Sequence, residues 1–314
     1  MTNNFFHTPY SFTKTDCAAI LRHSLFFFIT QHSQIPWISR DYTKHHNTHS
    51  LTGTKERTNK AMKIGITEYG DAGVDFRWED RLGEVDGAVL ITKNLNPVFQ
   101  SKVLEHAKTK PIIVHCTCTG WGGTVMEPNV PTYKQQLDWL CNFIKSGFPA
   151  ERIVLRIDPI FPTHKGLNNV LCMINYMRTL DIPADKLRYR ISVVDEYPHV
   201  RERYKKLGFT PMYGGNFYPS AEQLALVGET LSTLPYKFAT CAEDKLAAMF
   251  PNTFEIKGCI SRDDLALIGL QPDDSFTENP QHRTGCHCLS CKYELLNKPR
   301  KKCPHNCLYC FWKN

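Results

Sequence analysis

Three cysteines near the C-terminal end of the sequence have a spacing that is typical of a metal centre. Residues 303–310 read CPHNCLYC, so Cys303, Cys307 and Cys310 follow a C-x3-C-x2-C pattern. Thiolate sulfur selects zinc, copper(I) or iron–sulfur clusters, whereas structural zinc normally takes four protein ligands. Three cysteines leave one metal position open, which favours a [4Fe–4S] cluster whose fourth iron binds a small molecule. Asn306 tolerates the left-handed backbone of a tight turn.

Four other cysteines are candidates for a second centre. Cys286 and Cys288 form a C-x-C pair, and Cys241 and Cys259 each follow a predicted strand. The carboxyl ends of the strands in a parallel barrel share one rim, where a returning C-terminal segment can reach them. The hypothesis is that these four cysteines bind zinc or another cluster. The alternative is that Cys241 and Cys259 are small buried residues, as free cysteines often are.

Polar side chains at the ends of predicted strands are the catalytic candidates, namely Lys93, Arg156, Asp158 and Asp195. Loops at this end of a parallel barrel build the active site. Lys93 suits contact with a phosphate or acid–base work. Arg156 and Asp158 suit binding of a carboxylate or of ribose hydroxyls, or alternatively an internal ion pair. For each residue alone, a helix cap or a turn is the simpler interpretation.

Glycines between a buried strand and a helix are candidates for cofactor binding. Gly120, Gly122 and Gly123 follow the apolar run 111–118. Glycine lets the backbone approach a ligand closely, and it equally allows a tight turn. Both interpretations stay open at this point.

The elements that must position these residues are predicted to be alternating strands and helices. Buried runs such as Gly87–Thr92 alternate with helical patterns such as Leu167–Leu180,. A strand over Arg152–Ile157 should end at Asp158-Pro159. This alternation predicts an α/β protein with a parallel sheet. The number of strands, about six to eight, favours a TIM-like β/α barrel or partial barrel over an open sheet.

Three regions are predicted along the chain. Residues 1–61 show no sustained period and are interpreted as a disordered or mis-assigned N-terminal extension, with the functional protein beginning near Met62,. Residues 62–280 form the barrel-like domain. Residues 281–314 form a cysteine-rich iron–sulfur segment.

The composition indicates a globular protein that works in a reducing compartment. The chain has 314 residues, of which 42% are hydrophobic and 22% charged. Thirteen cysteines, six of them between Cys286 and Cys310, occur without a clear export signal, which indicates metal binding rather than a disulfide scaffold. No stretch approaches the ~18 apolar residues of a membrane-spanning helix. We therefore expect a cytoplasmic protein without a membrane partner.

The positive charge lies at the two ends of the chain. Residues 1–61 carry seven Lys/Arg against three Asp/Glu, and residues 281–314 carry seven against one. Since the net charge of the whole chain is +7, the part between them is mildly acidic. Basic ends aid solubility, and they also suit contact with nucleic acid.

The C-terminal motif also resembles a known signature. With Tyr309 before the last cysteine, C-x3-C-x-aromatic-C is similar to the motif of radical S-adenosylmethionine enzymes. That resemblance implies that the open iron chelates the amino and carboxylate groups of adenosylmethionine, which reductive cleavage converts to a 5′-deoxyadenosyl radical. It also implies a reductant such as flavodoxin or ferredoxin, and places Tyr309 beside the cofactor with the glycines named above.

A broader resemblance covers most of residues 87–314. It is to an uncharacterised, mainly prokaryotic family, the domain of unknown function numbered 1848. The matching pieces are 92–94 with Pro97, 156–160, 191–195, 241–243, 258–260, 286–288 and 303–310. The family is thought to be related to radical enzymes that repair DNA photoproducts, which implies a nucleic acid or nucleotide substrate. Radical enzymes usually carry the three cysteines after their first strand. Here the barrel must be permuted, or the segment must fold back over it.

Three functions are therefore kept in view. The first is a [4Fe–4S] enzyme of the radical adenosylmethionine type that acts on an unknown substrate. The second is a zinc-stabilised nucleic-acid-binding module without catalysis, in which the six C-terminal cysteines hold zinc. The third is a redox or electron-transfer iron–sulfur protein that does not use adenosylmethionine.

Overall fold

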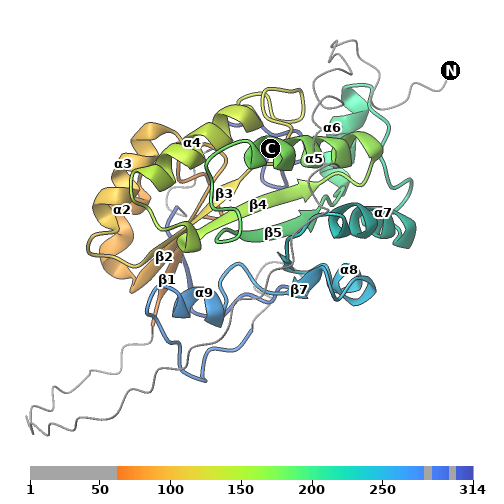
Figure 1. Cartoon of the computed structure of the whole chain (residues 1–314). Coiled ribbons are helices and arrows are strands. Elements are labelled where there is room, and N and C mark those ends of the chain that lie inside the picture. The colour runs from red at the N-terminus through yellow and green to blue at the C-terminus, as the bar shows by residue number, and fades with distance from the viewer. Residues whose placement is uncertain (1–61, 279–284, 297–301, 314) are drawn as a thin grey trace, which may run out of the picture. The chain divides into compact units, whose positions relative to one another are not determined.

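The computed structural model describes residues 62–278, 285–296 and 302–313 (Figure 1). These residues all fall within one compact unit. The predicted N-terminal extension lies outside the described residues, so its nature stays a prediction. In the described part of the chain, none of the helices has the length and apolarity needed to span a bilayer.

Eight strands form one sheet in the order β7-β6-β5-β4-β3-β2-β1-β8, and every neighbouring pair is parallel. The strands are β1 (Ile64–Ile66), β2 (Gly87–Thr92), β3 (Ile112–Thr117), β4 (Ile153–Ile160), β5 (Arg188–Val193), β6 (Phe238–Thr240), β7 (Phe254–Ile256) and β8 (Lys292–Glu294). The predicted α/β class and parallel sheet are confirmed. Among the described residues no pairing joins the edge strands β7 and β8, so closure into a barrel stays a prediction.

One predicted boundary was wrong. The strand that was expected to stop at Asp158-Pro159 continues as β4 to Ile160. The register between β4 and β5 shifts between Ile157 and Ile160. Such an irregularity accommodates a proline that cannot donate to the ladder, and the strand resumes its pairing beyond it.

The helices follow the strands in the order expected for a parallel sheet. They are α2 (Trp78–Arg81), α3 (Pro97–His106), α4 (Tyr133–Lys145), α5 (His164–Arg178), α6 (Pro198–Lys206), α7 (Ala221–Ser232), α8 (Asp244–Met249) and α9 (Arg262–Ala266). Side chains that accept a backbone N–H begin the longest of them, namely Asn96, Thr132, Thr163 and Ser220. These residue types are the preferred N-caps because their oxygens satisfy an otherwise unpaired donor.

The two faces of the sheet are covered in different ways. One face packs against the helices, and Figure 1 shows α3, α4 and α5 side by side along it. The other face presents Ile66, Val89 and Ile91 to Ile260 and Leu289, which come from the chain after β7. The C-terminal part of the chain thus fills the side that strands of a closed barrel would surround.

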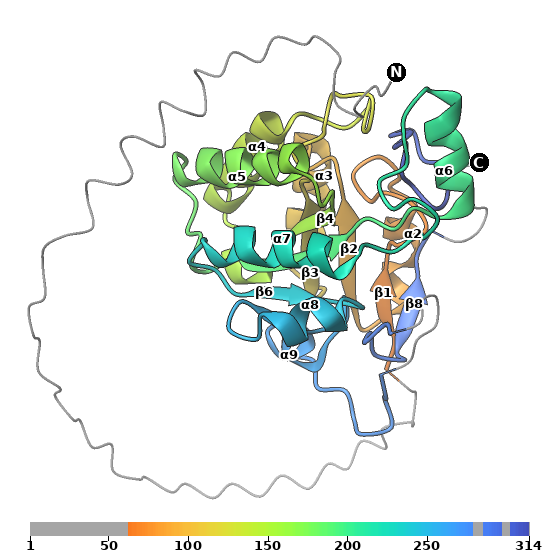
Figure 2. The ribbon, with the colours of Figure 1, turned by 90° about the vertical axis from the view of Figure 1, so that its right-hand side faces the viewer.

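The cysteine segment 302–313 follows the edge strand β8. In the sheet, Ile64 and Ile66 of β1 pair with Lys292 and Glu294 of β8. Beyond β8 the chain passes to the side where the parallel strands end, and Figure 2 shows its C-terminal part beside α6. The segment therefore lies over the carboxyl ends of the strands, where the catalytic candidates were predicted.

Candidate metal centre

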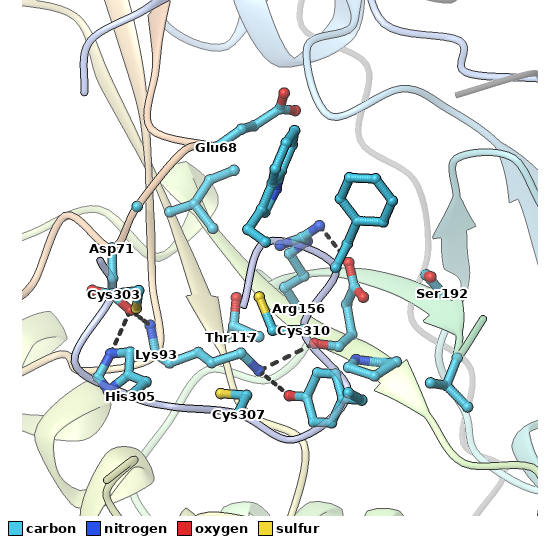
Figure 3. A pocket seen from close by; sticks show the side chains of 18 of the residues that line it. Glu68, Asp71, Lys93, Thr117, Arg156, Ser192, Cys303, His305, Cys307 and Cys310 are labelled. Atoms are coloured by element: carbon cyan, nitrogen blue, oxygen red, sulfur yellow. Dashed lines mark hydrogen bonds and ion pairs between the residues drawn. The ribbon is translucent and has the colours of Figure 1, made fainter. Parts of the chain in front are cut away.

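A cavity of about 380 Å³ lies at the carboxyl ends of β1 to β5 (Figure 3). Its volume falls within the range of roughly 300–1,000 Å³ that is usual for small-molecule sites. Cys303, Cys307 and Cys310 all line it. So do the four catalytic candidates and Tyr309, namely Lys93, Arg156, Asp158, Asp195 and Tyr309. The structure brings these sequence-predicted residues together, although their individual roles stay predictions.

The three sulfur atoms of the C-terminal motif form a looser group than the ligands of one zinc ion. Among the described residues, the groups of potential ligands whose atoms all lie within 4.8 Å of one another do not include Cys303, Cys307 and Cys310 together. Four sulfurs around one zinc ion lie about 3.8 Å apart, because each Zn–S bond is about 2.3 Å long. Burial raises the pKa of Cys303 to about 11 and that of Cys307 to about 12. Metal binding here must therefore release protons.

His305 fixes the motif to the loop after β1. Its Nε2 lies 2.8 Å from an Asp71 carboxylate oxygen, and its Nδ1 lies 3.1 Å from the carbonyl oxygen of Asn129. Burial lowers the pKa of His305, but the hydrogen bond and charge of Asp71 outweigh burial and raise it. Asp71 also accepts hydrogen bonds of 2.6 Å from the Thr92 hydroxyl and from the Lys93 backbone N–H. A buried, charged pair thus holds the middle of the motif.

Glu127 joins the motif to Lys93 and was missed by sequence reasoning. The Lys93 ammonium donates to Glu127 over 2.8 Å and to the Tyr309 hydroxyl over 2.9 Å. Tyr309 and Thr119 also donate to the Glu127 carboxylate, whose side chain is 1% exposed. Burial lowers the pKa of Lys93, but the charges of Glu127, Cys307 and Asp158, together with the hydrogen bond to Glu127, outweigh burial and raise it. A lone acid in an irregular loop after β3 carries no sequence period that would reveal this role.

Further contacts of the segment come from α6 and from the loop after β3. Asn306 has a φ of 56°, which confirms the expected left-handed turn. The backbone N–H of Leu308 donates to the carbonyl of Met126 over 2.9 Å. From α6, His199 contacts the carbonyl of Phe311 over 3.0 Å, and Arg203 donates to the carbonyl of Cys310. Loops after three strands and one helix therefore hold the motif at both ends.

Residues 76–312 match the family described as the domain of unknown function DUF1848. The chain belongs to the DUF1848 family. The match includes all seven cysteines grouped above but begins after β1 and Asp71. No curated protein matches this DUF1848 chain.

In this DUF1848 protein Arg156 and Asp158 form an ion pair, and both line the cavity (Figure 3). Burial lowers the pKa of Arg156, and the charge of Asp158 raises it well above its usual value. The internal ion pair that the sequence left open is therefore present. It presents one positive and one negative group to the cavity, beside Glu68, Thr117 and Ser192, which no sequence pattern singled out.

The three candidate glycines lie away from the cavity lining. An added Cβ at Gly120 would lie 3.0 Å from Asn169, and one at Gly122 would lie 1.9 Å from the carbonyl oxygen of Pro131. Gly120 and Gly123 have φ values of 81° and 76°. Turn geometry and close packing therefore account for these positions, and a role in cofactor binding stays a prediction.

The cysteines of the second group lie near one another in two overlapping sets, and their role as metal ligands stays a prediction. The sulfurs of Cys241, Cys286 and Cys288 all lie within 4.8 Å of one another. Cys259 and Cys288 form a further group with the carboxylate of Glu68. Cysteines from three separate parts of the chain thus meet at one place that can hold a metal ion.

Proposed function

We propose that this protein is a [4Fe–4S] enzyme of the radical adenosylmethionine type. Cys303, Cys307 and Cys310 are the proposed cluster ligands, and the cavity beside them is the proposed site for adenosylmethionine and substrate. The observation that carries the proposal is the convergence of these cysteines with charged strand-end residues on one cavity. Their sulfurs are spread more widely than one zinc ion requires, which fits a cluster in which each thiolate binds a different iron,.

The order of the strands supports the same proposal. In the resembling enzymes the three cysteines follow the first strand. Read across the sheet from its β8 edge, the order is β8, β1 and on to β7. The cysteine segment follows β8, and is therefore the loop after the first strand of this order. A permuted chain reconciles the late position of the motif in the sequence with the expected position in the fold.

The charged residues of the cavity suit the polar groups of adenosylmethionine. A reduced cluster bound there would supply the electron that cleaves adenosylmethionine. Reduction of the cluster would require a reductant such as flavodoxin or ferredoxin. Lys93 and Arg156 are cations that can bind a carboxylate. Asp158 and Asp195 can accept hydrogen bonds from ribose hydroxyls or an amino group. Phe311 and Trp312, which line the same cavity, limit the access of water to it.

Anaerobic reconstitution with iron and sulfide tests the proposal. The reconstituted protein should hold about four iron ions at the motif and release 5′-deoxyadenosine when it is reduced with dithionite in the presence of adenosylmethionine. Cys307→Ala should lose both properties. Cys141→Ala, which changes a buried cysteine on α4, is the matched control and should keep them. Full iron and sulfide in Cys307→Ala would refute the ligand assignment. Iron–sulfur absorbance without deoxyadenosine would indicate the redox function instead.

The proposed substrate class is a nucleic acid or nucleotide. A nucleic acid or nucleotide suits the resemblance and the excess of Lys and Arg in residues 281–314,. Binding of labelled single-stranded and duplex DNA should weaken steeply with salt if the basic residues contact phosphates. Binding that does not depend on salt would argue against a nucleic acid.

A further inference from the structure

The cysteines of the second group come from opposite edges of the sheet. Cys241 follows β6 and Cys259 follows β7, whereas Cys286 and Cys288 precede β8. Strands β7 and β8 are the two ends of the strand order. We propose that one zinc ion, bound by Cys241, Cys259, Cys286 and Cys288, joins these two edges. This edge site is distinct from the proposed cluster and does not depend on it.

The spacing of the sulfurs fits a single ion. Sγ of Cys241 lies 3.7 Å from Sγ of Cys286, which matches the edge of about 3.8 Å in a tetrahedral zinc–thiolate site. Sγ of Cys288 lies within 4.8 Å of both sulfurs and also of Sγ of Cys259. Thiolates on separate irons of a cluster lie farther apart than the sulfurs of Cys241, Cys286 and Cys288, which favours zinc over a second cluster. Cys259 is close to Cys288 but does not lie within 4.8 Å of both Cys241 and Cys286, so its side chain must shift to complete the set.

The surrounding charge suits an anionic metal centre. Zinc with four thiolates carries a net charge of −2. Arg190, which is 3% exposed, reaches the carbonyl of Cys259 over 3.4 Å. Arg188 and Arg190 share the single carboxylate of Asp264, so one buried positive charge is left over. Within the described residues Nε of Arg190 also lacks a hydrogen-bond partner. An anionic zinc–thiolate group would compensate this charge, because buried charges need a counter-charge.

The nearby non-sulfur groups already have partners. His287 lies between two of the cysteines, but its ring contacts Glu278 over 2.8 Å and Asp244 over 3.1 Å. Glu68 approaches Cys259 and Cys288, but it forms an ion pair of 2.7 Å with Lys292. The ligand set is therefore four sulfurs, which is a closed set typical of structural zinc.

The positions of the four cysteines indicate that the metal would link the two edges of the sheet. Among the described residues no backbone pairing joins β7 to β8, so the ligands span a break in the ladder. Glu68 lines the cavity, and its carboxylate lies within 4.8 Å of the sulfurs of Cys259 and Cys288. Zinc at the edge site would therefore hold the cavity wall in place without taking part in the reaction.

Metal analysis of the purified full-length chain tests the proposal. The unaltered protein should carry about one zinc ion per chain, since one tetrahedral site takes all four cysteines. Cys288→Ala should lower zinc at least tenfold. Cys291→Ala should keep zinc, because it removes a buried cysteine three residues away that belongs to neither group. Full zinc in both Cys288→Ala and Cys241→Ala would overturn the proposal.

Two further measurements keep the test decisive if Cys288→Ala does not fold. X-ray absorption at the zinc edge of the unaltered protein should show four sulfurs at about 2.3 Å, and nitrogen or oxygen neighbours would contradict the ligand set. The triple variant Cys303→Ala, Cys307→Ala and Cys310→Ala should lose iron after reconstitution and retain zinc. Iron that persists in this variant at the level of a cluster would show that the edge site holds a second cluster. Failure of the radical activity alone would leave the zinc result unaffected.

Discussion

The two cysteine groups of this protein use the same side chain in opposite ways. The cysteines of the motif, Cys303, Cys307 and Cys310, are spread around a cavity beside charged residues. Three cysteines of the edge site, Cys241, Cys286 and Cys288, lie within 4.8 Å of one another, and Cys259 lies close to Cys288. Under the two proposals, spacing and surroundings, rather than residue type, distinguish a site with room for a ligand from a site that holds parts of the chain together.

The largest expected effect is a loss of stability when cysteines of the edge site are removed, and its absence would contradict the comparison. Changing both Cys241 and Cys259 to Ala should destabilise the protein by at least ~5 kcal/mol, because the binding energy of structural zinc is folding energy. Thermal unfolding with and without a chelator measures this. Cys141→Ala should unfold near the temperature of the unaltered protein. A double variant as stable as the unaltered chain would mean that the edge site has no structural role.

A smaller effect should arise at the motif. Glu127→Ala leaves the largely buried ammonium of Lys93 without its carboxylate, and removing one partner of a buried pair costs about 3 kcal/mol or more,. Urea unfolding should show this loss, and iron retention should fall because Tyr309 is released. Glu151→Ala, which removes a half-exposed ion pair with Lys186, should cost under ~1 kcal/mol. Equal losses in the two variants would contradict the proposed buried network.

A dependence on pH should arise at β8, which connects the two cysteine groups along the chain. Burial raises the pKa of Glu294 from 4.5 to about 7. The protonated carboxyl is favoured in the fold, so its contribution is complete below pH 4.5 and is lost as pH rises through about 7. Stability should fall by about 2 kcal/mol between pH 5 and pH 8 through this group.

Glu294→Gln should flatten the change in stability over that pH range. The measurement is the midpoint of urea unfolding at several pH values for the two proteins. Identical pH profiles would show that Glu294 has an ordinary pKa in the folded protein.

The smallest expected effect concerns the hydrogen bond between His305 and Asp71. Asp71→Asn keeps the shape of the side chain but removes its charge. The free energy of unfolding should fall by about 1.5 kcal/mol, the lower end of the range for a hydrogen bond to a charged group. Hydrogen exchange should increase in residues 302–313 while β2 and β3 stay protected. Asp138→Asn, which alters an exposed hydrogen bond to Tyr176, should change neither. Faster exchange throughout the sheet would indicate that Asp71 supports the fold rather than the motif.

Sequence reasoning predicted the parallel sheet for sound physical reasons. Strands such as β2 and β3 are largely apolar and are buried at every residue, which is the pattern of a parallel sheet covered on both faces. Thiol spacing within the motif is likewise local information. Residues at strand ends converge because parallel strands share one direction, so Lys93 and Asp195 could be placed on the same side in advance.

The features that were not predicted depend on contacts between distant parts of the chain. Strand β8 has the sequence Lys292-Tyr293-Glu294, which has no apolar run, and it is a strand because it pairs with β1. Glu127 matters because Lys93 and Tyr309 reach it from elsewhere. Neither residue type nor period carries such information in one sequence.

The position of the motif after every strand of the sheet sets an order of assembly. Synthesis runs from the N-terminus, so β1 to β8 leave the ribosome before Cys303 does, and earlier segments can fold first,. The residues that contact the motif, namely Asp71, Glu127 and Arg203, are therefore synthesised before its cysteines. A cluster bound at the motif would then be delivered onto a surface that the preceding strands and helices have already formed.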